Sequence, residues 1–235
     1  QYLRSFYERD LAAGRLNREE ALDLFCHLWV KVAELGEVTN ICIGGLTPAG
    51  SDATNELSYL ALEATALVMS PHTNLSARFH DRTPEAFHRA CFRCIRTGLG
   101  FPAIFNDEVT VNGLRDIGLP AEVARDYCLV GCIETMLAGR QPAWSDSRFN
   151  SPVFLLRALA RAEAEGAATY ERMSELFREE LRAGLRAHAE NIVAQAAQYP
   201  PDRFPDPFLS AVTRDCVTRA LDLNAGGAEF PRFHG

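Results

Sequence analysis

Helical and strand-like segments alternate through residues 1–135, and this order constrains the fold more than any other feature of the sequence. Apolar residues recur at helical spacing in some segments and form short continuous runs in the segments between them. The expected elements are helices over 17–36, 52–69 and 83–98 and strands over 38–45, 73–79 and 102–105. Because strands that alternate with helices usually pair in parallel, the sequence predicts an α/β fold.

Capping residues set the expected ends of these helices. Asn17 followed by Glu20 has the form of a capping box, and Gly36 is suited to the residue just after a helix. Asp52 is expected to begin the second helix, and Pro84 is expected in the first turn of the third.

The second half of the chain is expected to be mostly helical. A short helix begins near Leu119, and an apolar strand-like run covers 127–132. The later predicted helices cover about 152–165, 168–198 and 207–220. The stretch 157–198 is rich in Ala, Arg and Glu, and we interpret it as a solvated helical surface rather than a partner-binding site.

Charge and composition exclude several classes of function. The net charge is −7 and no block of Lys and Arg occurs, which argues against a nucleic-acid surface and against binding to an anionic membrane. No apolar run reaches the roughly 18 residues of a membrane span, and residues 1–20 carry no signal-peptide pattern. An odd number of cysteines, seven, argues against a secreted disulfide framework, so a cytoplasmic location is expected.

Cys132 is the candidate catalytic residue. It is the last residue of the apolar strand-like run, and Gly131 before it permits a left-handed turn or a close backbone approach. A cysteine and a glutamate two residues apart at a strand end project to the same side, so Glu134 is a candidate general base beside the thiol. Without further context, a cysteine in such a place is more often a buried core residue.

Asp146 is a third candidate, twelve residues after Glu134. A second carboxylate in the same cavity would bind a polar group of a substrate or tune the acid–base partner. On spacing alone, an N-cap or turn role before the helix near residue 152 is the simpler interpretation.

Other residues that bind metals or phosphate in proteins do not form a known motif here. Asn106, Asp107 and Glu108 follow a predicted strand without periodic ligand spacing, so we expect a loop cap. Cys91 and Cys94 lie within a helical pattern and are expected to pack in the core. The sequence contains no catalytic histidine motif and no phosphate-binding glycine loop, so no metal or nucleotide site is predicted.

Six ordered segments are more specific together than any one of them alone. They cover 24–31, 44–58, 71–78, 98–108, 124–134 and 207–228. They include two glycines followed by Asp-x-Thr-Asn-x-Leu-Ser, a Pro-x-x-Asn-Leu-x-x-Arg strand and the Gly-Cys-Ile-Glu run at Cys132. In this order they resemble the pyruvate formate-lyase-like glycyl radical enzyme family over nearly the whole chain.

The resemblance implies both a fold and a mechanism. The fold is a ten-stranded α/β barrel made of two half-barrels, with Cys132 on a loop that threads the interior. In the implied mechanism, a backbone glycyl radical takes a hydrogen atom from Cys132, and the resulting thiyl abstracts hydrogen from a substrate carbon. A separate S-adenosylmethionine iron–sulfur activating enzyme installs the glycyl radical, and no cofactor bound directly to this chain is expected. The barrel excludes water and positions the reacting atoms.

Departures from the family pattern refine the expected chemistry. Pyruvate formate-lyase itself carries two adjacent cysteines, whereas Gly131 and Ile133 flank Cys132 here. The eliminating members carry Gly-Cys-Val-Glu-Pro, from which this chain keeps Glu134 and has Thr135 in place of the proline. The chain therefore resembles the dehydratase and lyase members more than pyruvate formate-lyase.

The resemblance assigns three residue roles within an elimination reaction on a small hydroxylated substrate. Cys132 is expected to form the thiyl radical, Glu134 to act as general base and Asp146 to bind substrate. The expected enzyme is a dehydratase or a C–N or C–S lyase. Three alternatives stay open: a formate acetyltransferase-like member, an arylacetate decarboxylase-like member, and a truncated non-catalytic paralogue that acts as a binding or scaffold subunit.

Residues 1–235 are expected to be a fragment, the central to C-terminal part of the barrel domain. The family's Arg-Val-x-Gly-Tyr segment, which holds the radical glycine, does not occur in this sequence. The N-terminal part and the C-terminal glycyl radical domain are thus expected outside it, and the fragment alone is expected to be inactive. The full-length protein is expected to be a cytoplasmic homodimer of anaerobic metabolism, whose partners are a small-molecule substrate and the activating enzyme.

Overall fold

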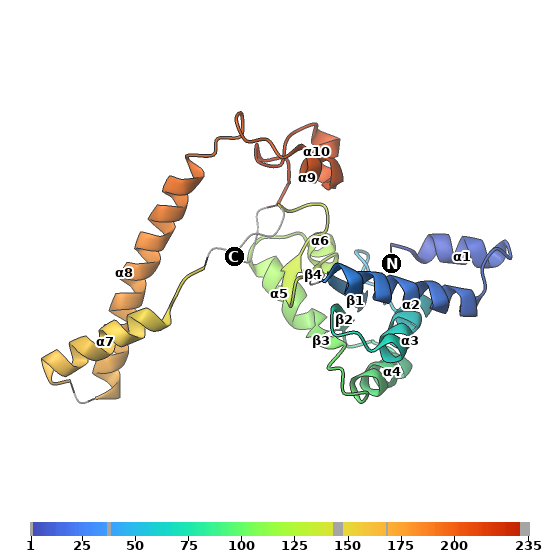
Figure 1. Ribbon diagram of the computed structural model, residues 1–235, viewed down its shortest axis with the longest axis horizontal. Coiled ribbons are helices and arrows are strands. Elements are labelled where there is room, and N and C mark those ends of the chain that lie inside the picture. Colours follow the sequence, from blue (N-terminus) through green and yellow to red (C-terminus); the bar gives the residue numbers. More distant parts are fainter. Residues whose placement is uncertain (1, 37–38, 143–147, 168, 231–235) are drawn as a thin grey trace. The chain divides into compact units, whose positions relative to one another are not determined.

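The computed structural model describes residues 2–36, 39–142, 148–167 and 169–230. These residues form two compact units, one ending at Ala138 and the other beginning at Gly139 (Figure 1). The first unit is a mixed α/β structure and the second is helical.

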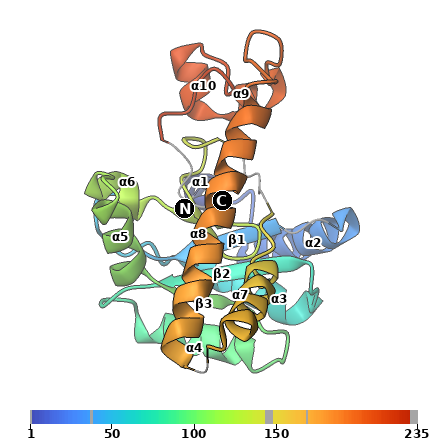
Figure 2. The same ribbon diagram turned by 90° about the vertical axis from the view of Figure 1, so that its left-hand side faces the viewer.

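A three-stranded parallel sheet forms the centre of the first unit, as Figure 2 shows. Its strands lie in the order β1 (Thr39–Gly44), β2 (Thr73–Phe79) and β3 (Ala103–Asn106). Both neighbouring pairs are parallel, and the connections run through α3 (Glu56–Val68) and α4 (Glu85–Ile95). The parallel α/β arrangement that the alternation of segments predicts is confirmed.

The register of β1 and β2 separates their side chains into two faces, because successive residues of a strand point to opposite sides. Asn40 lies beside Asn74, and Cys42 lies beside Ser76. One face contacts the β-hairpin formed later in the chain by residues 128–136, and we call it the hairpin face. It consists of Asn40, Cys42, Asn74, Ser76 and Arg78. The opposite face, the helix face, consists of Ile41, Ile43, Leu75, Ala77 and Phe79.

The helix face packs against α2 (Arg18–Leu35), α3 and α4 in a shared hydrophobic core. Trp29, Leu75 and Phe87 are fully buried there. Full burial of one large apolar side chain stabilises a fold by about 1.5–3 kcal/mol relative to leaving it exposed. Nε1 of Trp29 also donates a 2.9 Å hydrogen bond to Thr65 Oγ1, so its polar atom is satisfied inside the core.

Local sequence signals around these helices are confirmed. The Asn17 side chain accepts a hydrogen bond from the Glu20 backbone, and the Glu20 carboxylate accepts one from the Asn17 backbone. Gly36 follows α2 in the left-handed conformation, with φ of 68°. Cys91 and Cys94 are buried members of the core, as expected.

Two helix starts differ from the prediction. The helix expected from Asp52 begins at Glu56, because the Asp52 carboxylate lies 3.0 Å from Nε2 of the buried His80 instead of capping the helix. Asn55 is the N-cap of α3. Pro84, expected inside the first turn of α4, is the N-cap residue of that helix.

The remaining elements of the first unit are α1 (Arg4–Ala12), α5 (Asp107–Asp116), α6 (Ala121–Arg125), β4 (Cys128–Val130) and β5 (Glu134–Met136). The sequence did not indicate α5 or β5. The run 127–132, predicted as one strand, stops at Val130, because the chain turns back there and β5 pairs with β4 in antiparallel register.

The second unit contains α7 (Pro152–Glu165), α8 (Tyr170–Ala196), α9 (Pro207–Val212) and α10 (Arg214–Arg219). The predicted helix over 207–220 is divided at Thr213, whose backbone is extended, with φ of −96° and ψ of 114°. Within the described part of the chain, no helix is both long and apolar enough to cross a membrane.

Candidate active site

Cys132 lies at the tip of the β-hairpin formed by β4 and β5. Val130 pairs with Glu134, so Gly131, Cys132 and Ile133 form the connecting turn. Gly131 adopts a left-handed conformation with φ of 59°, which glycine reaches without strain. Cys132 is exposed within the described chain. The turn therefore presents its thiol at the end of a hydrogen-bonded element rather than in the core.

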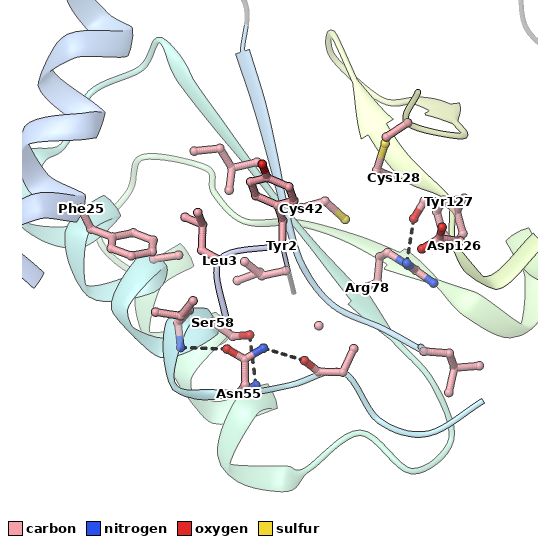
Figure 3. Close-up of a pocket in the computed structure, with 18 of the residues that line it drawn as sticks. Tyr2, Leu3, Phe25, Cys42, Asn55, Ser58, Arg78, Asp126, Tyr127 and Cys128 are labelled. Carbon is pink, nitrogen blue, oxygen red and sulfur yellow. Dashed lines mark hydrogen bonds between the residues drawn. The ribbon is translucent and has the colours of Figure 1, made fainter. Parts of the chain in front are cut away.

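The first strand of the hairpin, β4, runs antiparallel to β2 across the hairpin face. At its base, Arg78 Nη1 donates a 2.7 Å hydrogen bond to the Tyr127 carbonyl, as Figure 3 shows. At its tip, Asn74 Nδ2 donates a 3.1 Å hydrogen bond to the Gly131 carbonyl. Arg78 and Asn74 are four residues apart, and so are Tyr127 and Gly131, so the two segments advance in matched steps.

A buried ion pair fixes the base of the hairpin. Arg78 Nε and Nη2 donate 2.9 Å hydrogen bonds to the two carboxylate oxygens of the fully buried Asp107. The Tyr127 hydroxyl donates a 2.7 Å hydrogen bond to the same carboxylate, and the Arg78 guanidinium carbon lies 3.8 Å from the centre of the Tyr127 ring. Burial alone would lower the pKa of Arg78, but hydrogen bonding to Asp107 and its negative charge raise that pKa above its usual value. The guanidinium therefore stays charged and holds Tyr127 in place.

Gly45 lets the chain pass over this ion pair after β1. Its φ of +78° is left-handed, and a Cβ atom there would lie 2.6 Å from Arg78 Nε. The backbone N–H of Leu46 donates a 2.8 Å hydrogen bond to Asp107 Oδ2. Close approach to Arg78 is thus the steric reason for glycine at this position.

The middle of the hairpin face holds the thiol of Cys42 and the hydroxyl of Ser76, and strand β4 of the hairpin holds a second thiol, Cys128. Burial raises the pKa of Cys42 to about 12 and also raises the pKa of Cys128, so both thiols keep their protons near neutral pH. Cys128 Sγ donates to the Met136 carbonyl at 3.4 Å. Within the described residues, Ser76 Oγ is buried without a hydrogen-bond partner.

Side chains from both strands and from the hairpin itself hold the tip. Asn40 Nδ2 lies 3.4 Å from the Gly131 carbonyl oxygen and 3.3 Å from that of Cys132, and donates to both. The Glu134 carboxylate, through Oε2, accepts hydrogen bonds from the backbone N–H groups of Cys132 at 2.9 Å and Ile133 at 3.0 Å. The cysteine turn is thus held on its carbonyl side and on its N–H side.

Two of the three candidate residues lie together. The Glu134 carboxylate contacts the backbone of Cys132, so the acid and the thiol belong to one turn. Asp146 lies outside the described residues.

Four residues of this site were missed or misread in the sequence. The loop cap expected at 106–108 is present only at Asn106, which caps α5, whereas Asp107 is the buried partner of Arg78. Asn74 and Arg78 stand in the Pro-x-x-Asn-Leu-x-x-Arg motif but were given no role at the site, and Asn40 was not singled out. The signal that could have found them is the alternation of polar and apolar residues in β1 and β2, which gives the sheet one polar face.

A cavity of about 440 Å³ lies beside β1 and borders α2, α3 and the base of the hairpin. Its lining includes Phe25, Cys42, Asn55, Ser58, Tyr127 and Cys128, drawn in Figure 3. Among the described residues, neither Cys132 nor Glu134 lines it, so we do not assign it as the substrate site.

Metal ligands do not cluster in the described parts of the chain. No group of three or more His, Cys, Asp or Glu side chains there is arranged to hold a metal ion.

Comparison with known proteins gives a consistent set of similarities. A family model described as pyruvate formate lyase-like matches residues 1–234. The chain is 29% identical over 263 residues to (2S)-3-sulfopropanediol dehydratase from Klebsiella oxytoca. This alignment covers 98% of this chain and 32% of that protein. It is 36% identical over 156 residues to isethionate sulfite-lyase from Nitratidesulfovibrio vulgaris, covering 60% of this chain and 19% of the relative.

A solved structure shows the same fold over nearly the whole chain. The protein studied for 1,2-propanediol dehydration in Roseburia inulinivorans aligns with a TM-score of 0.86 and 28% identity. The alignment covers 98% of this chain and 32% of that protein. The chain therefore spans about a third of the length, or less, of the proteins that it matches.

Proposed function

The chain belongs to the pyruvate formate lyase-like family of glycyl radical enzymes, and from this premise we propose that it is part of a radical lyase. Its reaction is the elimination of a leaving group from a small hydroxylated substrate, as a dehydratase or as a C–N or C–S lyase. The relatives support this class, because they include a dehydratase and a sulfite-lyase. The substrate class comes from these relatives and from the residues at the cysteine turn.

The observation that carries the proposal is the cysteine turn itself. Cys132 stands exposed at the tip of a hairpin, and the Glu134 carboxylate lies against the backbone of the same turn. A thiol and a carboxylate held in one turn can act on one substrate, since hydrogen-atom transfer and proton transfer both require contact distances.

The glycyl radical that the family uses fits this position of Cys132. When present, it supplies the one-electron oxidation of the thiol. The described residues leave Cys132 accessible at the hairpin tip, so a further segment of a longer chain can approach its sulfur.

In the proposed reaction, Cys132 moves a hydrogen atom and Glu134 moves a proton. The thiyl form of Cys132 forms an S–H bond as the C–H bond at the hydroxyl-bearing carbon breaks, and the unpaired electron passes from the sulfur to that carbon. Glu134 accepts the hydroxyl proton, and the resulting ketyl expels the leaving group, with its electron pair, from the neighbouring carbon. That carbon then carries the unpaired electron and takes the hydrogen atom back from Cys132.

Acyl transfer through a second cysteine finds less support. Gly131 and Ile133 flank Cys132, and the nearest other cysteine in sequence, Cys128, is directed to the Met136 carbonyl. Burial raises the pKa of Cys128, which keeps it in the poorly nucleophilic thiol form. Elimination therefore accounts for the turn better than a formate acetyltransferase reaction does.

We further propose that residues 1–235 form the central to C-terminal part of a ten-stranded α/β barrel domain in a longer enzyme. The parallel β1–β2–β3 sheet supplies three of its strands, and the hairpin carries Cys132 into its interior. A role for Asp146 in substrate binding, a cytoplasmic homodimer and a radical S-adenosylmethionine activating enzyme as partner belong to the same proposal.

The test is product analysis on the full polypeptide that carries this chain, activated without oxygen. Vicinal diols such as 1,2-propanediol and sulfopropanediol, then isethionate, then an arylacetate, are offered in turn. We expect an aldehyde or ketone with release of water or sulfite, and no product from Cys132→Ala. Turnover by Cys132→Ala would contradict the proposal. Decarboxylation of the arylacetate alone would replace elimination by the decarboxylase alternative.

Glu134→Gln separates the two tasks of the carboxylate. The amide oxygen still accepts hydrogen bonds from the turn, but the side chain no longer accepts the hydroxyl proton. We expect turnover to fall by about 10²–10⁴-fold, the usual contribution of a general base. A variant with near-normal turnover would remove Glu134 from the reaction.

A further inference from the structure

The carbonyl groups of the cysteine turn are held by a pair of asparagines. Asn40 and Asn74 are direct neighbours on β1 and β2, and both amides are directed at the hairpin tip. Asn74 donates to the Gly131 carbonyl at 3.1 Å, and Asn40 donates to the Cys132 carbonyl at 3.3 Å. Each of the two peptide groups that flank Cys132 thus has its oxygen tied to the sheet.

The N–H groups of the same two peptides are held from the other side. The Cys132 and Ile133 N–H groups both donate to Glu134 Oε2. The two peptide planes that define φ and ψ of Cys132 are therefore each held at both ends. With both planes held, the direction of the Cα–Cβ bond is set, and only rotation about that bond is left to aim the sulfur.

We propose that Asn40 and Asn74 are positioning residues that, with Glu134, form a backbone clamp and hold the Cys132 sulfur in line for hydrogen-atom transfer. The clamp consists of these three side chains. The proposal rests on the proposed role of Cys132 and adds two residues to that site.

The clamp is expected to act on the rate of hydrogen-atom transfer by placing the Cys132 sulfur, rather than by stabilising the fold. Hydrogen-atom transfer needs the sulfur and the reacting carbon in contact, and a misplacement of about 1 Å can cost on the order of 100-fold in rate. Cys132 and Ile133 are exposed at the hairpin tip, so packing against the core does not hold these two residues of the turn. The clamp supplies that restraint through hydrogen bonds from the sheet, which is itself anchored in the core on its helix face.

The distribution of hydrogen bonds along the hairpin face supports a specific role for the asparagines. Arg78 holds the base and the asparagine pair holds the tip. Between them, the buried Ser76 hydroxyl makes no hydrogen bond within the described residues. The face therefore does not bind the hairpin uniformly, and its amides are placed at the turn that carries Cys132.

Asn74→Asp and Asn40→Ala test the clamp in the full polypeptide, with Ser76→Ala as a matched control. Aspartate matches asparagine in shape but offers no N–H group, so it loses the hydrogen bond without leaving a hole. Ser76 lies on the same face, and its hydroxyl has no hydrogen bond to lose within the described part of the chain. Asn74→Gln keeps the amide donor and serves as the conservative variant.

The first readout does not depend on turnover. Hydrogen exchange of the backbone amides of Cys132 and Ile133 is followed by mass spectrometry in unactivated protein. We expect faster exchange in Asn74→Asp and Asn40→Ala, and unchanged exchange in Ser76→Ala. Exchange elsewhere in β1 and β2 reports whether a variant has lost its fold rather than its clamp.

The second readout is turnover after activation. We expect kcat to fall by about 10- to 100-fold in Asn74→Asp and Asn40→Ala with the glycyl radical signal unchanged, and part of the loss to return in Asn74→Gln. KM should change by less than about twofold, because Asn40 and Asn74 bind the backbone of the turn rather than the substrate. Exchange and kcat equal to those of Ser76→Ala, while Cys132→Ala is inactive, would overturn the clamp and leave the proposed function intact. Turnover by Cys132→Ala would overturn the proposed function itself.

Discussion

The two faces of the β1–β2 sheet are built on different physical principles. The helix face buries Leu75 and its apolar neighbours against three helices, an interaction that is strong but not directional. The hairpin face binds its partner through side-chain hydrogen bonds to backbone atoms, which are individually weaker but fix positions. The same strands therefore stabilise the fold on one side and place the Cys132 turn on the other.

The largest loss of unfolding free energy is expected from replacing Arg78 on the hairpin face. Arg78→Leu leaves the Asp107 carboxylate buried without its cation, which costs about 3–5 kcal/mol of unfolding free energy. Thermal and urea unfolding of the full polypeptide measure the loss. Arg78→Leu/Asp107→Asn, which removes both charges, should recover part of it. A loss below about 1 kcal/mol would show that the ion pair does not anchor the hairpin base.

A substitution on the helix face is expected to lower the unfolding free energy by a comparable amount without changing hydrogen exchange at the Cys132 turn. Leu75→Ala removes a fully buried side chain and leaves a cavity, which costs about 2–5 kcal/mol. Under conditions where the variant stays folded, hydrogen exchange at Cys132 and Ile133 should match the parent protein. Faster exchange confined to the turn would contradict the separation of the two faces.

A smaller effect is expected in the pH dependence of alkylation of Cys42, the thiol on the hairpin face. Because burial raises the pKa of Cys42 to about 12, its thiol keeps its proton as the pH rises from 7 to 10. Alkylation by iodoacetamide should therefore stay slow at Cys42 over this range, whereas in denatured protein it rises through the ordinary thiol pKa of about 8.5. The exposed Cys132 serves as the internal reference for reagent access. If the alkylation rate of Cys42 rose with pH in the same way in folded and in denatured protein, the hairpin face would be open to solvent.

The smallest effect is expected from Ser76→Ala. Its buried hydroxyl has no hydrogen-bond partner among the described residues, so removing it should change the unfolding free energy by no more than about 0.5 kcal/mol. Ser76 is the direct neighbour of Leu75, so the pair compares the two faces at adjacent positions. A loss as large as that of Leu75→Ala would reveal a contact of this hydroxyl that the described residues do not show.

The helix face was predictable from sequence because its signals are local. The strand over 73–79 and the capping box of Asn17 with Glu20 depend on neighbouring residues, and both are confirmed. Parallel pairing follows from the alternation of helices and strands, which is also a property of the sequence order.

The hairpin face was less predictable because its contacts join distant residues. Arg78 meets Asp107 across 29 positions, and Asn74 meets Gly131 across 57. No local rule links such residues, so Asp107 was interpreted as a loop cap, and Asn74 was recognised as part of a motif but not as a partner of the cysteine turn. Asp52 was misread for the same reason, since its partner His80 lies 28 positions away. Cys132 was identified through an ordered set of motifs rather than through any contact.

The transfer of deuterium through Cys132 tests the central claim most directly. The activated full polypeptide is given a substrate that carries deuterium on its hydroxyl-bearing carbon. If the Cys132 sulfur takes that atom and returns it after elimination, deuterium leaves its original carbon and appears on the neighbouring carbon of the product. We predict this migration in the parent enzyme and no product from Cys132→Ala. Product that keeps all its deuterium on the original carbon, or that forms in the absence of the thiol, would contradict the account.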